Sequence, residues 1–128
     1  MMTLNAIADW LAGLLPGVTV YCGSINANDS QCIGVYDRID AIRKQAIGGE
    51  MSHQDYPCRI LVHWTKNIAS CETQALAIQN ILLANRKATI DGHAVIDIQL
   101  TRPTPVNLGR DDNGIWESAI PMTIIYEV

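Results

Sequence analysis

The sequence predicts an α+β fold in which two helices pack on one face of a roughly five-stranded, mostly antiparallel sheet. From Trp116 to Val128, apolar residues alternate with other residues, which is the period of a strand. Leu4–Leu15 and the stretch after Asn67 place apolar residues at helical spacing instead. The chain has no Phe, so its core must consist mainly of Ile, Leu and Val, which suit a β-rich layer. The predicted order of elements is α-β-β-loop-β-α-β-β.

The start of the chain predicts a helix followed by a β-hairpin. Thr3 can cap a helix over Leu4–Leu15, and Pro16-Gly17 ends that helix. Val18–Cys22 alternates as a strand, and Gln31–Tyr36 follows a polar, turn-forming stretch as the next strand. We therefore expect these two strands to pair as a hairpin with a long loop.

Residues Asp37–Pro57 show no strand period, and we interpret them as a long connection. Loops of this length are uncommon in small domains and are often functional. The stretch also carries apolar side chains that a solvated loop does not need, namely Ile39, Ile42, Ala46 and Ile47. This pattern favours an arm that packs against another subunit.

The second half predicts a strand, a helix and two further strands. Cys58–Thr65 has apolar residues on both faces, which is typical of a central strand. Asn67 or Ser70 can cap the helix that follows. His93–Thr101 alternates as the next strand, whereas Val106–Gly114 is interpreted as a loop.

The final strand begins at Trp116 and contains Pro121, which has no backbone N–H. We therefore expect this strand to lie at an edge of the sheet or to be bulged there. An edge strand can serve as a docking surface for a neighbour. Because no internal repeat or shift in composition marks a boundary, we expect one domain over residues 1–128.

The composition argues against a protein that binds nucleic acid by itself. The formal net charge is −4 and the sequence pI is about 5.1, without a basic stripe. No stretch resembles a secretory signal or a membrane helix. We therefore expect reduced, intracellular thiols that behave as small hydrophobes at Cys22, Cys32, Cys58 and Cys71. Since there is no CxxC pair, neither a metal nor a cofactor is expected.

Two motifs lack the chemistry that they first suggest. Arg110–Gly114 resembles part of a calcium loop, but EF-hand spacing would put Gly109 and Ile120 at positions that require acids. We interpret this stretch as a polar turn. Gly48-Gly49 is not followed by the Lys-Ser/Thr of a P-loop. It is interpreted as a bend, or as a place where another chain approaches closely.

The sequence shows no nucleophile pattern, so we do not expect an enzyme. His53, His63 and His93 lie far apart along the chain. An acid–base pair could still assemble in space. For a small α+β enzyme or a ligand-binding dimer, His63 and Asp97 would be the first pair to consider.

Four segments in order carry a family resemblance over almost the full chain: YCGSINANDSQCIGVYDR, IGGEMSHQDYPCRILVHWTKN, ETQALAIQNIL and DDNGIWESAIPMTIIYE. They resemble phage minor capsid proteins of the tail-terminator-like, head–tail joining type found in siphophages and prophages. The resemblance implies a structural virion protein without a catalytic site. Such a protein forms a ring, expected to be a homohexamer, that ends tail-tube growth and leaves a channel for DNA.

The resemblance also implies the partners. These are further copies of the chain, the tail-tube protein and a head connector or head-closure protein, while DNA passes through without specific binding and no membrane is involved. The location would be the virion, after assembly in the cytoplasm of the bacterial host. Another head–tail connector or minor capsid subunit is the alternative, ahead of the ligand-binding dimer or enzyme.

The predicted contacts with other subunits or partners combine the long connection with the polar turn. We expect the basic residues of the connection to pair with acids on a neighbour. The residues predicted for this interface are Arg38, Arg43, Lys44, Gly48, Gly49, His53, Asp111 and Asp112.

Overall fold

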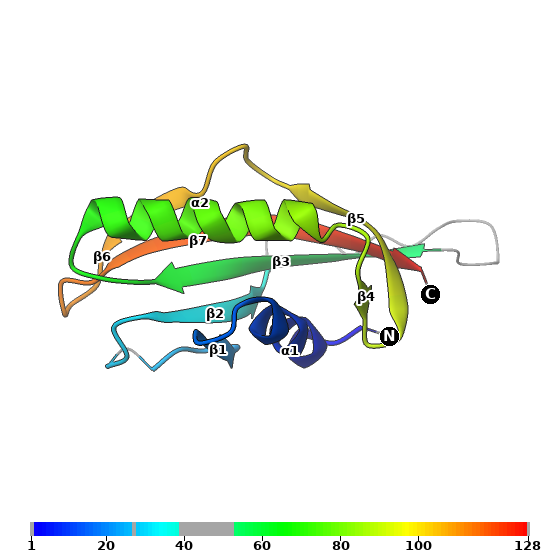
Figure 1. Cartoon of the computed structure of the whole chain (residues 1–128), viewed down its shortest axis with the longest axis horizontal. Coiled ribbons are helices and arrows are strands. Elements are labelled where there is room, and N and C mark those ends of the chain that lie inside the picture. Colours follow the sequence, from blue (N-terminus) through cyan, green and yellow to red (C-terminus); the bar gives the residue numbers. More distant parts are fainter. Residues whose placement is uncertain (1, 27, 39–52, 128) are drawn as a thin grey trace.

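The computed structural model describes residues 2–26, 28–38 and 53–127. These residues form two helices and seven strands (Figure 1). In chain order the elements are α1 (Leu4–Leu14), β1 (Thr19–Cys22), β2 (Cys32–Asp37), β3 (His53–His63), α2 (Ile68–Ala84), β4 (Thr89–Ile90), β5 (His93–Leu100), β6 (Val106–Arg110) and β7 (Trp116–Glu127). The α+β class is confirmed, but the number of strands and their arrangement differ from the prediction.

The strands form a mixed sheet in the order β1-β2-β3-β7-β5-β4, and β6 also pairs with β7. β7 is therefore the central strand. β3 runs antiparallel to it from the pair His53–Glu127 to the pair His63–Glu117. β5 and β6 share the other side of β7, one after the other. Residues 101–105 connect these two strands along that side.

Both of the unpredicted strands lack the period that marks a strand. β4 has only two residues. β6 lies in the stretch Val106–Gly114 that we interpreted as a loop, and its register shifts between Asn107 and Gly109. Gly109 has a φ of 93°, and its N–H donates to Asn107 Oδ1 at 2.8 Å. This bulge interrupts the alternation of side chains, so the pattern did not indicate a strand.

The pairing predicted for β1 and β2 is wrong: the two strands are parallel, from Thr19–Cys32 to Cys22–Val35. Residues 23–31 return the chain to the start of β1, and the N–H of Gly23 donates to the carbonyl of Val35. A parallel connection usually needs about a dozen residues or more. This one is shorter, which is why the spacing of the two strands predicted a hairpin.

β3 begins at His53 and not at Cys58, so the end of the predicted connection is a strand. The first residues of β3 pair with the end of β7, and the hydroxyl of Tyr126 donates to Gln54 Oε1 at 2.6 Å. Because the residues just before Pro57 are polar, they lack the apolar alternation that would have predicted this part of the strand. The rest of the predicted arm, residues 39–52, lies outside the described residues.

The prediction that β7 lies at an edge or is bulged at Pro121 is wrong, because β7 lies inside the sheet and its pairing with β3 passes Pro121 without a shift in register. The carbonyl of Pro121 accepts a hydrogen bond from the N–H of Thr101, on the side of β7 that β5 and β6 occupy. In a strand, the N and C=O of one residue point to the same side. The nitrogen of Pro121 therefore faces residues 101–105, where the chain leaves the sheet and no ladder bond is lost.

Both helices pack on the same face of the sheet. The Thr3 side chain caps α1 by accepting from Ala6 N, and Asn67 caps α2 by accepting from Ala69 N and Ser70 N. Apolar side chains of both helices meet one row of strand residues in the core. The core includes Ile7, Leu11, Ala75, Ile78, Leu82, Ile33, Val35, Ile60, Val62, Ile120, Met122 and Ile124. In Figure 1, α2 lies along β7 and β3, while α1 lies beside β1 and β2.

Candidate functional site

The face of the sheet that the helices leave uncovered carries a groove. Tyr36, Arg59 and Pro121, which lie next to one another on β2, β3 and β7, belong to this open face. The groove has a volume of about 470 Å³. Its lining residues, which define the open-face groove, are Asp37, Arg38, Arg59, Val106, Leu108, Ala119 and Pro121.

One wall of the open-face groove is β6. Within the described residues β6 pairs with β7 alone, so its outer side is an edge of the sheet. Leu108 on this strand is 49% exposed, although it is a large apolar residue. An edge strand with an exposed apolar side chain is suited to a protein partner.

Arginines border the groove, and their positions are held by neighbouring side chains. Arg38 Nη1 donates to Thr101 Oγ1 at 2.8 Å, which links the end of β2 to the residue after β5. The guanidinium of Arg59 lies 5.1 Å from the centre of the Tyr36 ring, a cation–π contact. Arg110, at the end of β6, lies 5.7 Å from the ring of Trp116 in the same way. Positive charge is therefore presented at fixed positions near the apolar edge.

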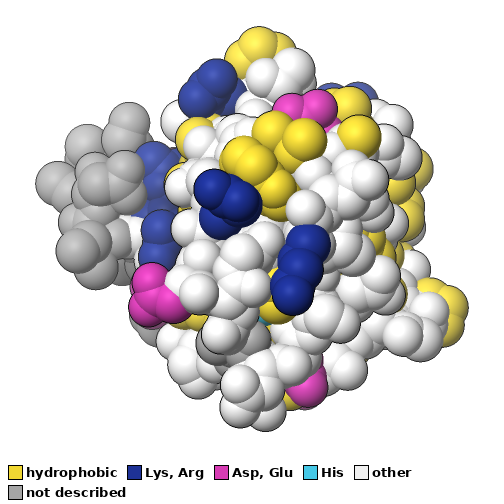
Figure 2. Space-filling model, turned by 90° about the vertical axis from the view of Figure 1, so that its left-hand side faces the viewer, with side chains coloured by type: hydrophobic (Ala, Val, Ile, Leu, Met, Phe, Trp, Pro, Cys, Tyr) yellow, Lys and Arg dark blue, Asp and Glu magenta, His cyan; other side chains and the backbone are white. Residues whose placement is uncertain are grey.

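Figure 2 shows the end of the molecule where α2 begins and the chain turns from β6 to β7. Lys and Arg side chains lie beside hydrophobic atoms on this end, and Asp or Glu side chains lie at the upper, left and lower parts of the same view. The turn before α2 contributes Lys66, and β6 contributes Arg110. The combination of charges of both signs with apolar atoms favours a protein partner.

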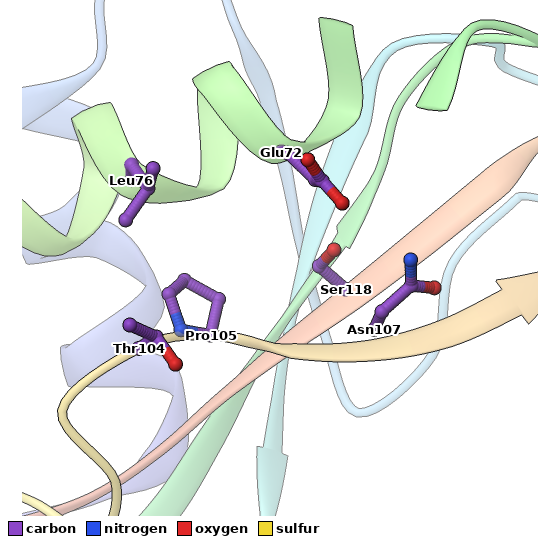
Figure 3. A pocket seen from close by; sticks show the side chains of 6 residues that line it. All are labelled: Glu72, Leu76, Thr104, Pro105, Asn107 and Ser118. Carbon is purple, nitrogen blue, oxygen red and sulfur yellow. The ribbon is translucent and has the colours of Figure 1, made fainter. Parts of the chain in front are cut away.

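A smaller pocket, of about 220 Å³, lies on the other side of β6 beneath α2 (Figure 3). Glu72 and Leu76 of α2 line it from above, and the polar side chains of Asn107 and Ser118 line it from the sheet. Gln79 Nε2 donates to the carbonyl of Pro103 at 2.8 Å, which fixes α2 to the chain just before β6. The polar groups that line this pocket are the carboxylate of Glu72, the amide of Asn107 and the hydroxyls of Thr104 and Ser118.

A buried histidine holds the turn between β6 and β7 against the sheet. His63 is fully buried, and its Nδ1 lies 3.0 Å from Glu117 Oε2 and 3.7 Å from Asp111 Oδ2. Asp111 Oδ1 accepts from the N–H groups of Asn113 and Ile115, both at 2.9 Å. Within the described residues, His63 Nε2 has no hydrogen-bond partner, so the ring is held through Nδ1 alone. Because no atom of the ring reaches the surface, this cluster fits a structural role rather than contact with a substrate.

The structure does not bring the four described residues of the predicted interface into one patch. Arg38 lines the open-face groove, while Asp111 and Asp112 lie in the turn after β6. His53 is at the opposite end of β3 from His63, so it is far from that turn. The other four predicted residues, Arg43, Lys44, Gly48 and Gly49, lie outside the described residues.

Sequence reasoning missed three features of the site. Val106 and Leu108 were assigned to a loop, and Arg59 was not singled out. The His63–Asp97 pair does not form: Asp97 pairs with Ile125 on the far side of β7 and accepts from the N–H of Ile98. Only the pairing of β3 with β7 reveals Glu117 as the partner of His63. No signal within either segment could have indicated this.

Three of the four cysteines are buried, while Cys22 is exposed. Burial raises the pKa of the Cys32 thiol to about 11, with further contributions from the carboxylates of Asp29 and Glu117. Among the described residues, no group of three or more His, Cys, Asp or Glu side chains could hold a metal ion. No helix in the same residues is long and apolar enough to cross a membrane.

The fold and the site fit the class of structural assembly subunits, because the most exposed large apolar side chain of the described residues, Leu108, lies on a strand edge. The chain belongs to the bacteriophage tail terminator protein family, whose model matches residues 3–128. It is therefore a structural protein of the phage virion. The resemblance to tail-terminator-like proteins that was read from the sequence is confirmed.

Solved structures share the fold. A chain of the virion of a native gene transfer agent particle is 9% identical, with a TM-score of 0.59 over 92% of this chain and 84% of that chain. Another solved chain, with no descriptive name, is 17% identical, with a TM-score of 0.50 over 97% of this chain and 88% of that chain. No curated protein matches the sequence. At these identities the likeness shows the fold alone.

Proposed function

We propose that this protein forms a homohexameric ring at the phage head–tail junction, where it ends tail-tube growth and leaves a channel for DNA. The family match over residues 3–128 carries this proposal. The geometry supports it, because the β6 edge and the open-face groove offer a surface for another protein chain. In this proposal the whole chain acts as one tail-terminator-like domain without catalytic activity.

The partners in this proposal are further copies of the chain, the tail-tube protein and a head connector or head-closure protein. Subunits would assemble in the cytoplasm of the bacterial host before they join the virion. DNA would pass through the ring without specific binding, which agrees with the net charge of −4. Positive charge on a subunit would then serve contacts between proteins rather than contacts with phosphates.

The connection between β2 and β3 remains a proposed contact with a neighbouring subunit or with the tube. Arg38 at its start lies in the open-face groove, and His53 at its end begins β3. A test must spare His53 and Gln54, because Gln54 accepts the hydrogen bond of the Tyr126 hydroxyl. Deleting residues 48–52 should therefore leave a folded chain, seen by circular dichroism, that no longer forms rings. An intact ring after this deletion would reject the proposed contact.

Native mass spectrometry, with and without the cognate tail-tube protein, tests the ring directly. A hexamer in either condition supports the proposal. A chain that stays monomeric with tube protein present contradicts the terminator role and favours another joining protein. A stable dimer with a ligand-sized pocket at its interface also contradicts the ring and favours a ligand-binding protein.

A further inference from the structure

Two strands of at least four residues have one side without a partner strand in the described part of the chain. β1 pairs with β2 alone, and the side chains of Thr19 and Cys22 at its ends are exposed. β6 pairs with β7 alone and exposes Leu108. These strands lie toward opposite margins of the sheet. The N–H and C=O groups on such edges can accept a strand from another chain.

The pairings of the sheet fix the relative direction of the two edges. β1 is parallel to β2, and the successive pairs β2–β3, β3–β7 and β7–β6 are all antiparallel. β6 therefore runs antiparallel to β1. If each sheet continues into the next around a ring, β6 of one copy meets β1 of the next in the antiparallel sense. Such a contact joins two different surfaces and closes by rotation.

The two margins also differ in charge. Residues 2–36 contain Asp9 and Asp29 and no Lys or Arg, whereas Asp37 lines the open-face groove. Asp29 lies beside β1, because it accepts a hydrogen bond from the hydroxyl of Tyr21. The β6 margin carries Arg110 on the strand and Arg59 in the adjoining groove, but it also carries Asp37 in that groove and Asp111 and Asp112 in the turn after the strand. Because the β1 margin has no basic residue of its own, Asp29 of one copy is available to the arginines at the β6 margin of a second copy.

We propose that β1 of one copy adds to the β6 edge of the next copy and so forms the contact between subunits. This inference rests on the proposed ring and assigns the surfaces that close it. The two strands must align so that side chains on the same face of the extended sheet lie opposite each other. Tyr21 pairs with Gly34 on the open face, and Leu108 lines the groove on that face. Tyr21 then packs against Leu108 of the neighbour, and Asp29 comes near the neighbour's arginines.

The same alignment places two residues together on the other face of the extended sheet. Cys22 pairs with Val35, whose side chain is in the core beneath the helices. Asn107 pairs with Ser118 and lines the pocket beneath α2, on that same side. Cys22 therefore lies beside Asn107 of the neighbouring copy. Native Cys22 should therefore be able to form a disulfide with a cysteine introduced at position 107 of the neighbouring copy.

In the first experiment, Asn107→Cys is introduced and the assembled protein is oxidised with oxidised glutathione. The expected product is a ladder of disulfide-linked oligomers that continues up to the size of the ring. The same variant in a Cys22→Ser background should give no ladder. Ile96→Cys, at an exposed position on β5, is the matched control and should also remain monomeric on denaturing gels.

The second experiment compares two substitutions that place an acid at exposed apolar positions. Leu108→Glu should weaken self-association by roughly tenfold or more, because it buries a carboxylate beside Asp29 of the neighbour. Ile96→Glu, at a position that is 36% exposed, should leave association unchanged. Thermal unfolding of dilute monomer should be similar for both variants and the parent protein, since both positions are on the surface.

Native mass spectrometry of the same samples separates this inference from the proposed function. A ring together with the full ladder supports both. A ring without the ladder, or one that tolerates Leu108→Glu, overturns the β1–β6 contact and leaves the ring proposal standing. A ladder that stops at dimers overturns the head-to-tail contact. Failure to form rings under all conditions, including with tube protein, rejects both.

Discussion

His63 and Glu117 stand opposite each other in the β3–β7 ladder, and His63 Nδ1 lies 3.0 Å from Glu117 Oε2. Asp111 approaches the same nitrogen at 3.7 Å from the turn that follows β6. The buried imidazole thus joins the end of β3, the start of β7 and this turn. The position of β6, the proposed contact strand, depends in part on this cluster because the turn follows β6 directly.

Replacement of Glu117 should destabilise the fold. In Glu117→Ala the buried His63 loses its closest hydrogen-bond partner, which we expect to cost about 1–3 kcal/mol of unfolding free energy. Glu117→Gln retains a polar partner and should cost less. Urea unfolding followed by circular dichroism measures both. Glu127→Ala, at the exposed end of the same strand, is the control. Equal unfolding free energies for Glu117→Ala and the control would contradict the role assigned to Glu117.

The two aspartates of the β6–β7 turn should respond differently to substitution. Asp111 Oδ1 accepts two backbone hydrogen bonds, from Asn113 N and Ile115 N, and Ile115 is buried. Asp111→Ala should therefore lower the unfolding free energy by about 1–2 kcal/mol. Asp112→Ala, at an exposed position, should change it by less than about 0.5 kcal/mol. The two variants can be compared in one denaturant series, and the reverse order of stability would refute this assignment.

Gly34 is a position where a methyl group does not fit. A Cβ there would lie 2.6 Å from Tyr36 Cε2 and 2.7 Å from Ile25 Cγ2. Gly34→Ala should therefore displace the loop that contains Ile25 and cost about 1–3 kcal/mol. Gly13→Ala is the matched control, since a Cβ at Gly13 meets nothing within 4 Å. If both variants melt at the same temperature, the close packing of Ile25 over β2 is not important for stability.

The cysteines should differ in reactivity in the folded protein. Cys22 is exposed and should react quickly with iodoacetamide at neutral pH, whereas Cys32, Cys58 and Cys71 are buried and should react only on unfolding. Mass spectrometry of the intact protein counts the labels. Rapid addition of more than one label without denaturant would contradict the burial of the other three thiols.

The raised pKa of Cys32 also predicts how stability changes with pH. The pKa moves from 9.0 to about 11, with burial as the first cause, so the folded state holds the proton more tightly than the unfolded state. The contribution of the Cys32 thiol to the unfolding free energy is complete below pH 9 and is lost as the pH rises toward 11. Unfolding free energy should therefore fall over this range, and less steeply in Cys32→Ala. Cys22→Ser should leave the slope unchanged, and an unchanged slope in Cys32→Ala would refute the assignment.

Much of the local structure follows from the sequence. The alternation after Trp116 predicted β7, the helical spacing after Thr3 predicted α1, and Asn67 was one of the two caps considered for α2. The apolar pattern of Cys58–Thr65 correctly predicted a central strand. Each of these features depends on residues close together in the chain, whose period or hydrogen bonding is evident in a single segment.

The relations between distant segments were decided only by the tertiary structure. The sequence contained no sign that β1 and β2 are parallel, that Val106–Arg110 is a strand, or that His63 meets Glu117. Strand order and register depend on which apolar faces can be buried together across the whole chain, and a period within one segment carries no information about its partner. The sequence by itself therefore determined both helices, most of the strands and the family. The folded chain alone decided which edges remain open for other subunits.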